Sequence, residues 1–353
     1  IDHPVVLHIY TEKGKGFEPA EQNHEKFHAG GPFSLETGEY IKKGAVTSTY
    51  NGITSEYLTK KLNEDPLAVV INAGTPGIVF NRKLREQLGS QFVDVGIAEE
   101  QAVTMTTGLA KNGAKPVWAV LSTFLQRTYD QLSHDMALNN QAGVVLVYSA
   151  SINSMNDESH LGFFDIPFIS HIPNFVYLAP INKEEHLAML EWAINQNEHP
   201  VAIRVPVGSV VETGEEDRTD YSILNKNKVV KYGEQVVIFG VGNFYNLAEE
   251  VSEKLKSEYN IDATLINPRF LTGLDKELLN SLKENHKLVV TVEDGIVEGG
   301  YGQTVASYLG NTELKVQNYG INKKFYDRYD VEELMKENGL TVENIVKNII
   351  ESL

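Results

Sequence analysis

A strand ends and a helix begins within the stretch Asp94-Val95-Gly96-Ile97-Ala98-Glu99-Glu100-Gln101-Ala102-Val103. An acid in the first turn of a helix is favoured by the helix dipole, so Glu99 can be explained as a helix-start residue alone. A carboxyl group at this place would also lie at the carboxyl edge of a parallel sheet, where ligand crevices of α/β proteins form. Both interpretations of Glu99 are open at this point.

The alternation of strand and helix continues on both sides of that stretch. Short apolar runs separated by helical patterns are typical of a parallel sheet that is covered on both faces. The predicted strands up to residue 208 are Ala68–Ala73, Phe92–Val95, Val117–Leu121, Val144–Tyr148, Phe175–Leu178 and Val201–Val205, with helices near 50–63, 98–112, 125–139 and 183–196.

A second domain follows a polar and acidic stretch at 209–228, which predicts a linker. Its predicted strands are Val236–Val241, Ala263–Ile266, Leu288–Val292 and Leu314–Val316, with helices near 244–257, 275–284, 301–309 and 331–352. The predicted fold class is therefore α/β, with two doubly wound parallel-sheet domains at 46–211 and 212–353. Residues 1–45 hold one predicted strand, Val5–Tyr10, and are too few to form a core alone. Because the chain starts without Met and directly before this strand, we expect a preceding segment to be missing or to lie on another chain.

Composition excludes several classes of function. The chain has 353 residues, a formal net charge of -17 and no cysteine. The acidic balance opposes nucleic acid and anionic membranes as partners, because phosphate binding needs clustered Lys and Arg. Without cysteine there are no disulfides, zinc–cysteine sites or cysteine nucleophiles. No apolar run approaches the roughly 20 residues of a membrane helix and no signal peptide is visible, so we expect a cytoplasmic protein.

Two further stretches have residue types suited to a site. Ser122–Gln131 follows a predicted strand and carries Phe124 and Arg127, which could stack on and orient a flat heterocycle. A capped helix with Phe124 as a hydrophobic staple would explain the same residues. His160 lies in a polar loop, either as an acid–base group or as an ordinary solvated histidine, and His28 permits the same two interpretations.

The order of these stretches resembles the 1-deoxy-D-xylulose-5-phosphate synthase family, within the transketolase-like, thiamine-diphosphate-dependent superfamily. The matching stretches are, in chain order, Thr11–Glu21, Phe27-His28, Asp94–Val103, Ser122–Gln131, His160–Asp165 and Val290–Gly302. The family has three α/β domains. The resemblance therefore makes 1–45 the tail of the diphosphate-binding domain, 46–211 the pyrimidine-binding domain and 212–353 the transketolase C-terminal domain.

The resemblance also implies roles for cofactor-binding residues. Glu99 matches the glutamate that hydrogen-bonds N1′ of the aminopyrimidine and thereby favours the imino tautomer, whose nitrogen removes the thiazolium C2 proton. A partly desolvated carboxyl suits that role. Phe124 matches the ring that stacks on the pyrimidine, with Arg127 as its neighbour. Ile97 and Lys13 match further residues near the cofactor.

Two histidines complete the implied site, since His28 and His160 match residues that line the substrate site and move protons. The implied reaction is decarboxylation of pyruvate and condensation with D-glyceraldehyde 3-phosphate, or another aldehyde or sugar-phosphate acceptor. It feeds isoprenoid and thiamine biosynthesis in this family. The Gly-Asp-Gly…Asn segment that holds the diphosphate and its Mg²⁺ is absent from the sequence. We therefore expect an N-terminal diphosphate-binding half as a partner, and a homodimer.

The sequence departs from the family where the acceptor phosphate is held. The family's Asp-Arg-Ala-Gly reads Tyr148-Ser149-Ala150-Ser151 here, and its Arg-Tyr-Pro-Arg-Gly reads Arg204-Val205-Pro206-Val207-Gly208. Ser149 and Val207 thus replace two arginines that bind phosphate strongly. An expected aspartate is Asn156, unless Asp157 takes its place. Three alternatives stay open: an unphosphorylated acceptor, another transketolase-like enzyme, or a non-catalytic paralogue.

Overall fold

The computed structural model describes residues 1–28, 31–41 and 48–353, which form two compact units, 1–47 and 48–353. In the first unit, helix α1 (Glu18–Gln22) lies next to a cluster of the Phe17, Phe27 and Phe33 rings, whose centroids are 5.0–5.6 Å apart. The predicted strand at 5–10 is wrong. They pair with no strand among the residues that the structure describes, and Val6 and Leu7 are 97% and 80% exposed.

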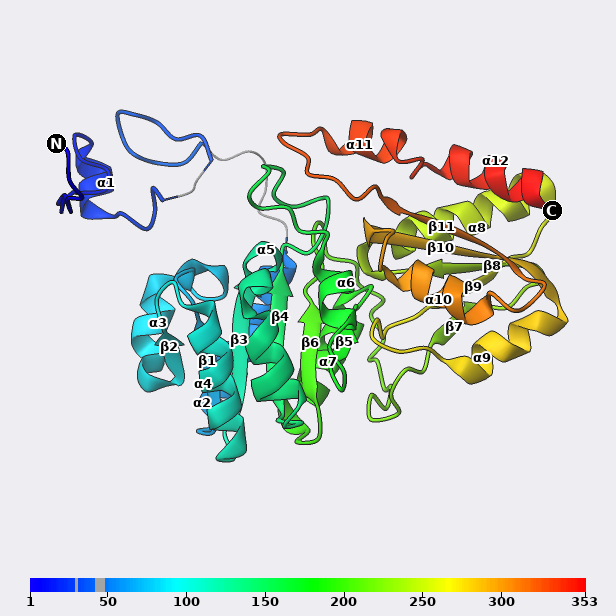
Figure 1. The fold of residues 1–353 in the computed structure, drawn as a ribbon, viewed down its shortest axis with the longest axis horizontal. Coiled ribbons are helices and arrows are strands. Elements are labelled where there is room, and N and C mark those ends of the chain that lie inside the picture. Colours follow the sequence, from blue (N-terminus) through cyan, green and yellow to red (C-terminus); the bar gives the residue numbers. More distant parts are fainter. Residues whose placement is uncertain (29–30, 42–47) are drawn as a thin grey trace. The chain divides into compact units, whose positions relative to one another are not determined.

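The second unit begins with a parallel sheet of six strands in the order β2-β1-β3-β4-β6-β5 (Figure 1). Every strand predicted for this region is present. The bounds are β1 Ala68–Asn72, β2 Phe92–Asp94, β3 Lys115–Leu121, β4 Gly143–Tyr148, β5 Val176–Leu178 and β6 Pro200–Arg204. The helices are α2 Tyr50–Glu64, α3 Arg82–Leu88, α4 Glu99–Lys111, α5 Ser122–Leu125, α6 Asp165–Ser170 and α7 Lys183–Asn195.

The helix predicted at 125–139 is divided in the structure. After α5 the chain forms a 3₁₀ turn at Gln126–Thr128 and a π-helix at Gln131–Ala137. π-Helical segments are rare and are often found at functional sites. The two short helices α3 and α6 were not predicted from the sequence.

A second sheet of five strands follows, in the order β11-β10-β8-β9-β7. Its strands are β7 Lys228–Lys231, β8 Gln235–Gly240, β9 Thr264–Asn267, β10 His286–Ile296 and β11 Lys315–Ile321. Its helices are α8 Tyr245–Tyr259, α9 Lys276–Ser281, α10 Tyr301–Leu309, α11 Val331–Glu337 and α12 Val342–Ser352. The α/β class with two sheets is confirmed, but the second sheet is mixed, because the unpredicted edge strand β7 is antiparallel to β9.

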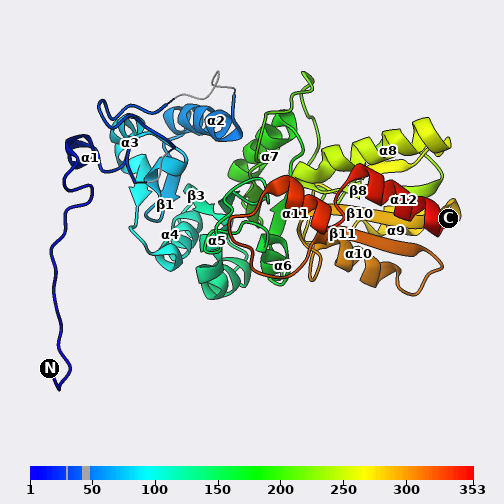
Figure 2. The same ribbon diagram turned by 90° about the horizontal axis from the view of Figure 1, so that it is seen from above.

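The predicted helix 331–352 is also wrong as a single element. It is interrupted between α11 and α12, where Gly339 has φ of +68°, a left-handed conformation that ends helices. Both helices still cover the second sheet on the side of α8, as Figure 2 shows.

Alternating residues of each central strand supply the cores on the two sheet faces. In β8, Val236 and Ile238 pack with α8 and α12, whereas Val237 and Phe239 pack with α9 and α10. The core that contains Val237 continues into the first sheet and includes Trp118 of β3. Within the described residues, no helix is long and apolar enough to cross a membrane.

Candidate active site

Glu99 is held at the carboxyl edge of the first sheet by the loops that precede α4. The carboxylate of Asp94, at the end of β2, accepts hydrogen bonds from the backbone N–H groups of Gly74 and Gly96, both at 2.9 Å. A side chain at Gly74 would meet Ile97 at 2.8 Å, so glycine permits this close approach. The chain then enters α4 with Glu99 as its first residue.

Glu99 is buried, at 2% exposure, and pairs with a partly exposed arginine. Arg127 Nη1 lies 3.0 Å from both carboxylate oxygens of Glu99, and 46% of the Arg127 side chain is exposed. The guanidinium carbon of Arg127 also lies 5.4 Å from the centre of the Phe124 ring. The sequence segments after β2 and β3 therefore meet at one edge of the sheet, where these two parallel strands end on either side of β1.

His160 approaches the same ring from another loop. The ring centroids of Phe124 and His160 are 5.5 Å apart, and the ring planes meet edge to face at 68°. His160 Nδ1 lies 2.9 Å from Asp157 Oδ1, and the Ser159 hydroxyl donates to the same oxygen at 2.5 Å. Hydrogen bonds from Ser159 and His160 lower the pKa of Asp157 to about 2, so Asp157 is an acceptor at neutral pH.

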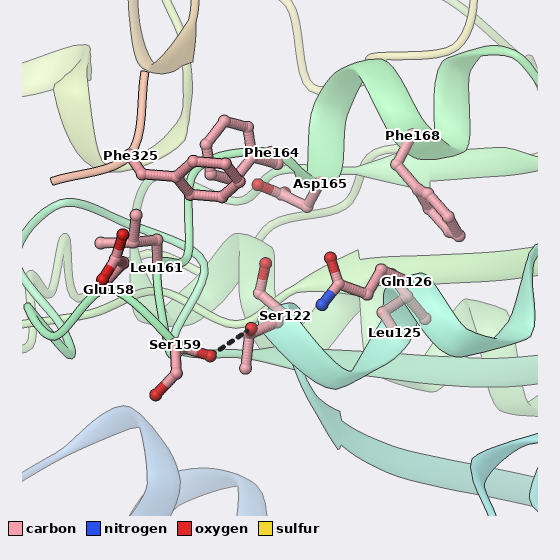
Figure 3. Close-up of a pocket in the computed structure, with 11 residues that line it drawn as sticks. Ser122, Leu125, Gln126, Glu158, Ser159, Leu161, Phe164, Asp165, Phe168 and Phe325 are labelled. Atoms are coloured by element: carbon pink, nitrogen blue, oxygen red, sulfur yellow. Dashed lines mark hydrogen bonds between the residues drawn. The ribbon is translucent and has the colours of Figure 1, made fainter. Parts of the chain in front are cut away.

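An aromatic pocket of about 330 Å³ adjoins this cluster. Figure 3 shows Phe164 and Phe325 next to each other on one side of the pocket and Phe168 near Gln126 on the other. The dashed line in Figure 3 is the hydrogen bond from the Thr123 hydroxyl to the Ser159 carbonyl, at 3.0 Å. This bond ties α5 to the loop that carries His160.

Arg204 forms a buried charge network next to the pocket, which the sequence did not predict. It lies at the end of β6, donates to Asp165 Oδ2 at 2.8 Å and pairs with Asp294 of β10. Asn243 donates to the other Asp294 oxygen at 3.0 Å, and Tyr177 donates to Asp165. Asp165 and Asp294 lie in stretches that match the family, and Arg204 lies in a stretch that departs from it, but the contacts among the three residues depend on the fold.

Comparisons with known proteins identify two domain families along the chain. Residues 48–211 match the family described as Transketolase, pyrimidine binding domain, and residues 225–345 match Transketolase, C-terminal domain. The chain belongs to the transketolase-like superfamily. Its match to this superfamily covers both sheets.

Curated relatives of the transketolase-like chain carry a more specific name. The chain is 38% identical to 1-deoxy-D-xylulose-5-phosphate synthase of Clostridium perfringens strain SM101, over 100% of this chain and 57% of the relative. It is 36% identical to the synthase of Clostridium tetani, over 98% of this chain and 56% of that protein. The chain thus spans somewhat more than half the length of these relatives.

A solved structure shows the same transketolase-like fold. It is titled "Split gene transketolase, inactive beta4 tetramer" and superposes with a TM-score of 0.74 at 23% sequence identity. The match covers 86% of this chain and 98% of that one. At this identity the likeness concerns the fold alone.

The structure brings together four of the predicted site residues of this transketolase-like chain: Glu99, Phe124, Arg127 and His160. Ile97 precedes α4 and is 81% exposed, which leaves an apolar side chain beside the buried Glu99. Lys13 and His28 lie in the first unit, where the Lys13 ammonium contacts His28 Nδ1. Whether those two residues join the cluster stays a prediction.

The two departures from the family pattern lie in one pocket. Ser149, after β4, and Val207, after β6, both line a cavity of about 370 Å³. Its other lining residues are Thr49, Tyr50, Asn51, Tyr148, Asn153, Ser154, Val205, Pro206 and Gly208, so no Lys or Arg of the described chain lines it. Asn156 donates to the Tyr329 carbonyl, and Asp157 instead is the partner of His160.

Proposed function

We propose that this chain supplies the pyrimidine-binding side of a thiamine-diphosphate site that transfers a two-carbon unit. The observation that carries the proposal is the buried Glu99 carboxylate, which Arg127 holds beside the half-buried Phe124 ring. These residues fit a flat heterocycle that carries a ring nitrogen. Glu99 could hydrogen-bond the nitrogen, and the Phe124 ring and the exposed Ile97 side chain offer apolar surface to the heterocycle. When bound, the cofactor supplies the stabilisation of carbanions that the protein itself lacks.

Glu99 would hold the proton at N1′ of the pyrimidine, and Arg127 would fix the direction of its carboxylate. A carboxylate that is desolvated on all sides but one binds a partner more strongly than an exposed one does. Phe124 would stack on the ring and exclude water from it. Glu99 is the first residue of α4, and the backbone before it is fixed by the hydrogen bonds of Gly74 and Gly96 to Asp94. The position of Glu99 therefore depends on the fold rather than on side-chain flexibility.

His160 would move protons at the substrate. Its Nδ1 is engaged by the ionised Asp157, so Nε2 is the nitrogen for exchange with substrate oxygen. Its contact with Phe124 places it next to the proposed pyrimidine site.

The proposed reaction is the decarboxylative condensation of pyruvate with D-glyceraldehyde 3-phosphate to 1-deoxy-D-xylulose 5-phosphate and CO₂. The support is the name shared by the curated relatives and their identity over the whole chain. A second candidate uses an unphosphorylated aldehyde as the acceptor. It is favoured by the pocket of Ser149 and Val207, whose described lining offers hydroxyl and amide groups rather than cations.

One assay separates these candidates. CO₂ release from pyruvate is measured with thiamine diphosphate and Mg²⁺, in the protein together with its diphosphate-binding region. Glyceraldehyde 3-phosphate and glyceraldehyde are compared as acceptors. Stronger stimulation by the phosphorylated aldehyde supports the synthase, and stronger stimulation by glyceraldehyde supports the second candidate. No CO₂ release with either acceptor would leave the non-catalytic alternative.

Two variants of α4 test the role of Glu99. Glu99→Gln removes the buried carboxylate, whereas Glu100→Gln changes the adjacent, exposed acid of the same helical turn. We expect Glu99→Gln to lower kcat by about a hundredfold or more, the usual scale of a lost acid–base group, and Glu100→Gln to be close to wild type. Equal effects of the two changes would contradict the assignment.

A further inference from the structure

The loop that carries His160 connects β4 and α6 of the first sheet region, but residues of the second sheet region hold it in place. It runs from Ser149, after β4, to Phe163, before α6, and is called the His160 loop below. Its two ends meet: a Cβ atom built on Gly162 would lie 1.8 Å from the Ser149 carbonyl oxygen. Only glycine permits this approach, so the loop is closed at its base.

Three apolar side chains of the His160 loop are buried in the core of the second sheet. Ile152, Leu161 and Phe163 are 0–4% exposed and pack with residues of β8, β10 and α8. The Phe163 carbonyl also accepts a hydrogen bond from the Ile296 N–H at 3.0 Å. These anchors fix the two ends of the loop and leave its middle, Asn153–His160, to be held by other contacts.

The segment after β11 supplies those contacts. The Tyr329 hydroxyl donates to the carbonyls of Ile152 at 2.9 Å and Met155 at 3.4 Å. The Asn156 side chain donates to the Tyr329 carbonyl at 2.9 Å. The Asn156 carbonyl in turn accepts from the Arg328 N–H at 2.7 Å, and Asp327 accepts from the Glu158 N–H at 3.3 Å.

These contacts lie on both sides of Asp157, at Asn156 and at Glu158, in the part of the loop that leads to His160. Burial raises the pKa of Tyr329 to about 12, so its hydroxyl stays a donor throughout the neutral range. Arg328 has φ of +47°, a conformation that a non-glycine residue adopts at a cost in free energy. In this conformation its N–H donates to the Asn156 carbonyl of the loop. The second sheet thus holds the loop through backbone geometry as well as through side chains.

We propose that Tyr329 is a positioning residue for His160. Its hydroxyl fixes the backbone at Ile152–Met155, and the loop then places His160, which contacts Asp157, against Phe124. The inference rests on the proposed function for the role of His160, but the position of the loop can be measured independently of activity.

Tyr326 provides a matched control in the same segment. Its ring lies 6.2 Å from that of Tyr329, and burial also raises its pKa. Its hydroxyl, however, donates to the Asn322 carbonyl at 3.3 Å and not to the His160 loop. The variants Tyr329→Phe and Tyr326→Phe therefore remove one hydroxyl each, and only the first removes contacts to the loop.

The experiment compares the two variants by amide hydrogen exchange and by CO₂ release in the protein with its diphosphate-binding region. We expect Tyr329→Phe to speed exchange in residues 152–160 about fivefold to tenfold, the scale of one lost neutral hydrogen bond. We expect kcat to fall by a similar factor, with a changed pH profile and unchanged affinity for thiamine diphosphate. Tyr326→Phe should change neither the exchange of the loop nor the pH profile.

Two results would overturn the inference. One is exchange of residues 152–160 that is the same in Tyr329→Phe as in wild type. The other requires that wild type is active: it is a change in kcat and in the pH profile that is equal in Tyr329→Phe and Tyr326→Phe. A merely structural role of Tyr329 predicts such equal changes. If wild type releases no CO₂, the proposed function fails by itself, and the exchange data alone decide whether Tyr329 positions the loop.

Discussion

Arg204, the last residue of β6, forms an ion pair with Asp294 of β10 and so joins the first sheet to the second. Both side chains are buried, at 1% and 0% exposure. Burial opposes the charge of Arg204, but Asp165 and Asp294 outweigh it and raise its pKa. The positive charge of Arg204 therefore compensates the buried carboxyl groups of Asp165 and Asp294.

Arg204→Met should destabilise the protein strongly, because it leaves Asp165 and Asp294 buried without a cation. We expect the free energy of unfolding to fall by about 3–5 kcal/mol, as when one partner of a buried pair is removed. Urea denaturation measures it. Arg218→Met is the control: Arg218 is 84% exposed and pairs with Glu216 at the surface, and we expect a change of about 0.5 kcal/mol or less.

Arg127→Met should weaken both the fold and the proposed cofactor site, because Glu99 loses the cation that lies 3.0 Å from each of its oxygens. A hydrogen bond to a charged group contributes about 1.5–3 kcal/mol, and the partial exposure of Arg127 places the expected loss at the lower end. Affinity for thiamine diphosphate, measured by titration, should fall. The double variant Glu99→Gln/Arg127→Met should be no less stable than Arg127→Met, since the unpaired charge is gone. A further loss in the double variant would contradict the pairing.

Gly162→Ala should disrupt the base of the His160 loop, because the added methyl group collides with a backbone oxygen rather than with a flexible side chain. We expect a loss of about 2 kcal/mol or more in unfolding free energy together with reduced CO₂ release. Gly108→Ala is the matched control. Gly108 lies in α4 with no atom within 4 Å of an added Cβ, so alanine should stabilise the helix by about 0.5–1 kcal/mol.

The central strands could be predicted from the sequence because their apolar runs are buried on both faces. The edge strand β7 and the interruptions of the helices predicted at 125–139 and 331–352 could not be predicted in this way. β7 is a four-residue edge strand with the pattern Lys-Val-Val-Lys, which resembles the end of a polar linker. The run Val5–Tyr10 has the composition of a strand but pairs with no strand in the described part of the chain. Composition alone does not distinguish a paired strand from an exposed one.

The candidate site was predictable where its residues follow parallel strands that end at the same edge of one sheet. Glu99 and Arg127 meet because β2 and β3 both flank β1 and end at the same edge. The contact of Tyr329 with Ile152 joins residues 177 positions apart, one in the segment after β11 and the other in the loop after β4. No local sequence pattern predicts such a contact. The hydrogen bonds that hold the His160 loop could therefore be identified only from the structure.

Glu293 of β10 is a fully buried carboxylate outside the proposed site. It accepts hydrogen bonds from the N–H groups of Tyr301 and Gly302, both at 2.9 Å, at the start of α10. Burial raises its pKa to about 7 against the ordinary 4.5, although the two N–H donors oppose the shift. The folded protein therefore takes up a proton there that the unfolded chain releases.

The pH dependence of stability follows from that difference. Because the folded-state pKa of Glu293 is the higher one, its contribution to stability is complete below about pH 4.5 and is lost as the pH rises through about 7. Between pH 5.5 and 8 this loss amounts to about 2 kcal/mol, at 1.36 kcal/mol per pKa unit. Glu293→Gln cannot titrate, so its unfolding free energy should fall less than that of wild type over this range, by about the same amount. Urea denaturation at the two pH values measures the difference. Glu298→Gln, a change of an exposed acid of the following loop, should keep the wild-type pH dependence, and an identical pH dependence in Glu293→Gln would show that Glu293 is not the group that titrates.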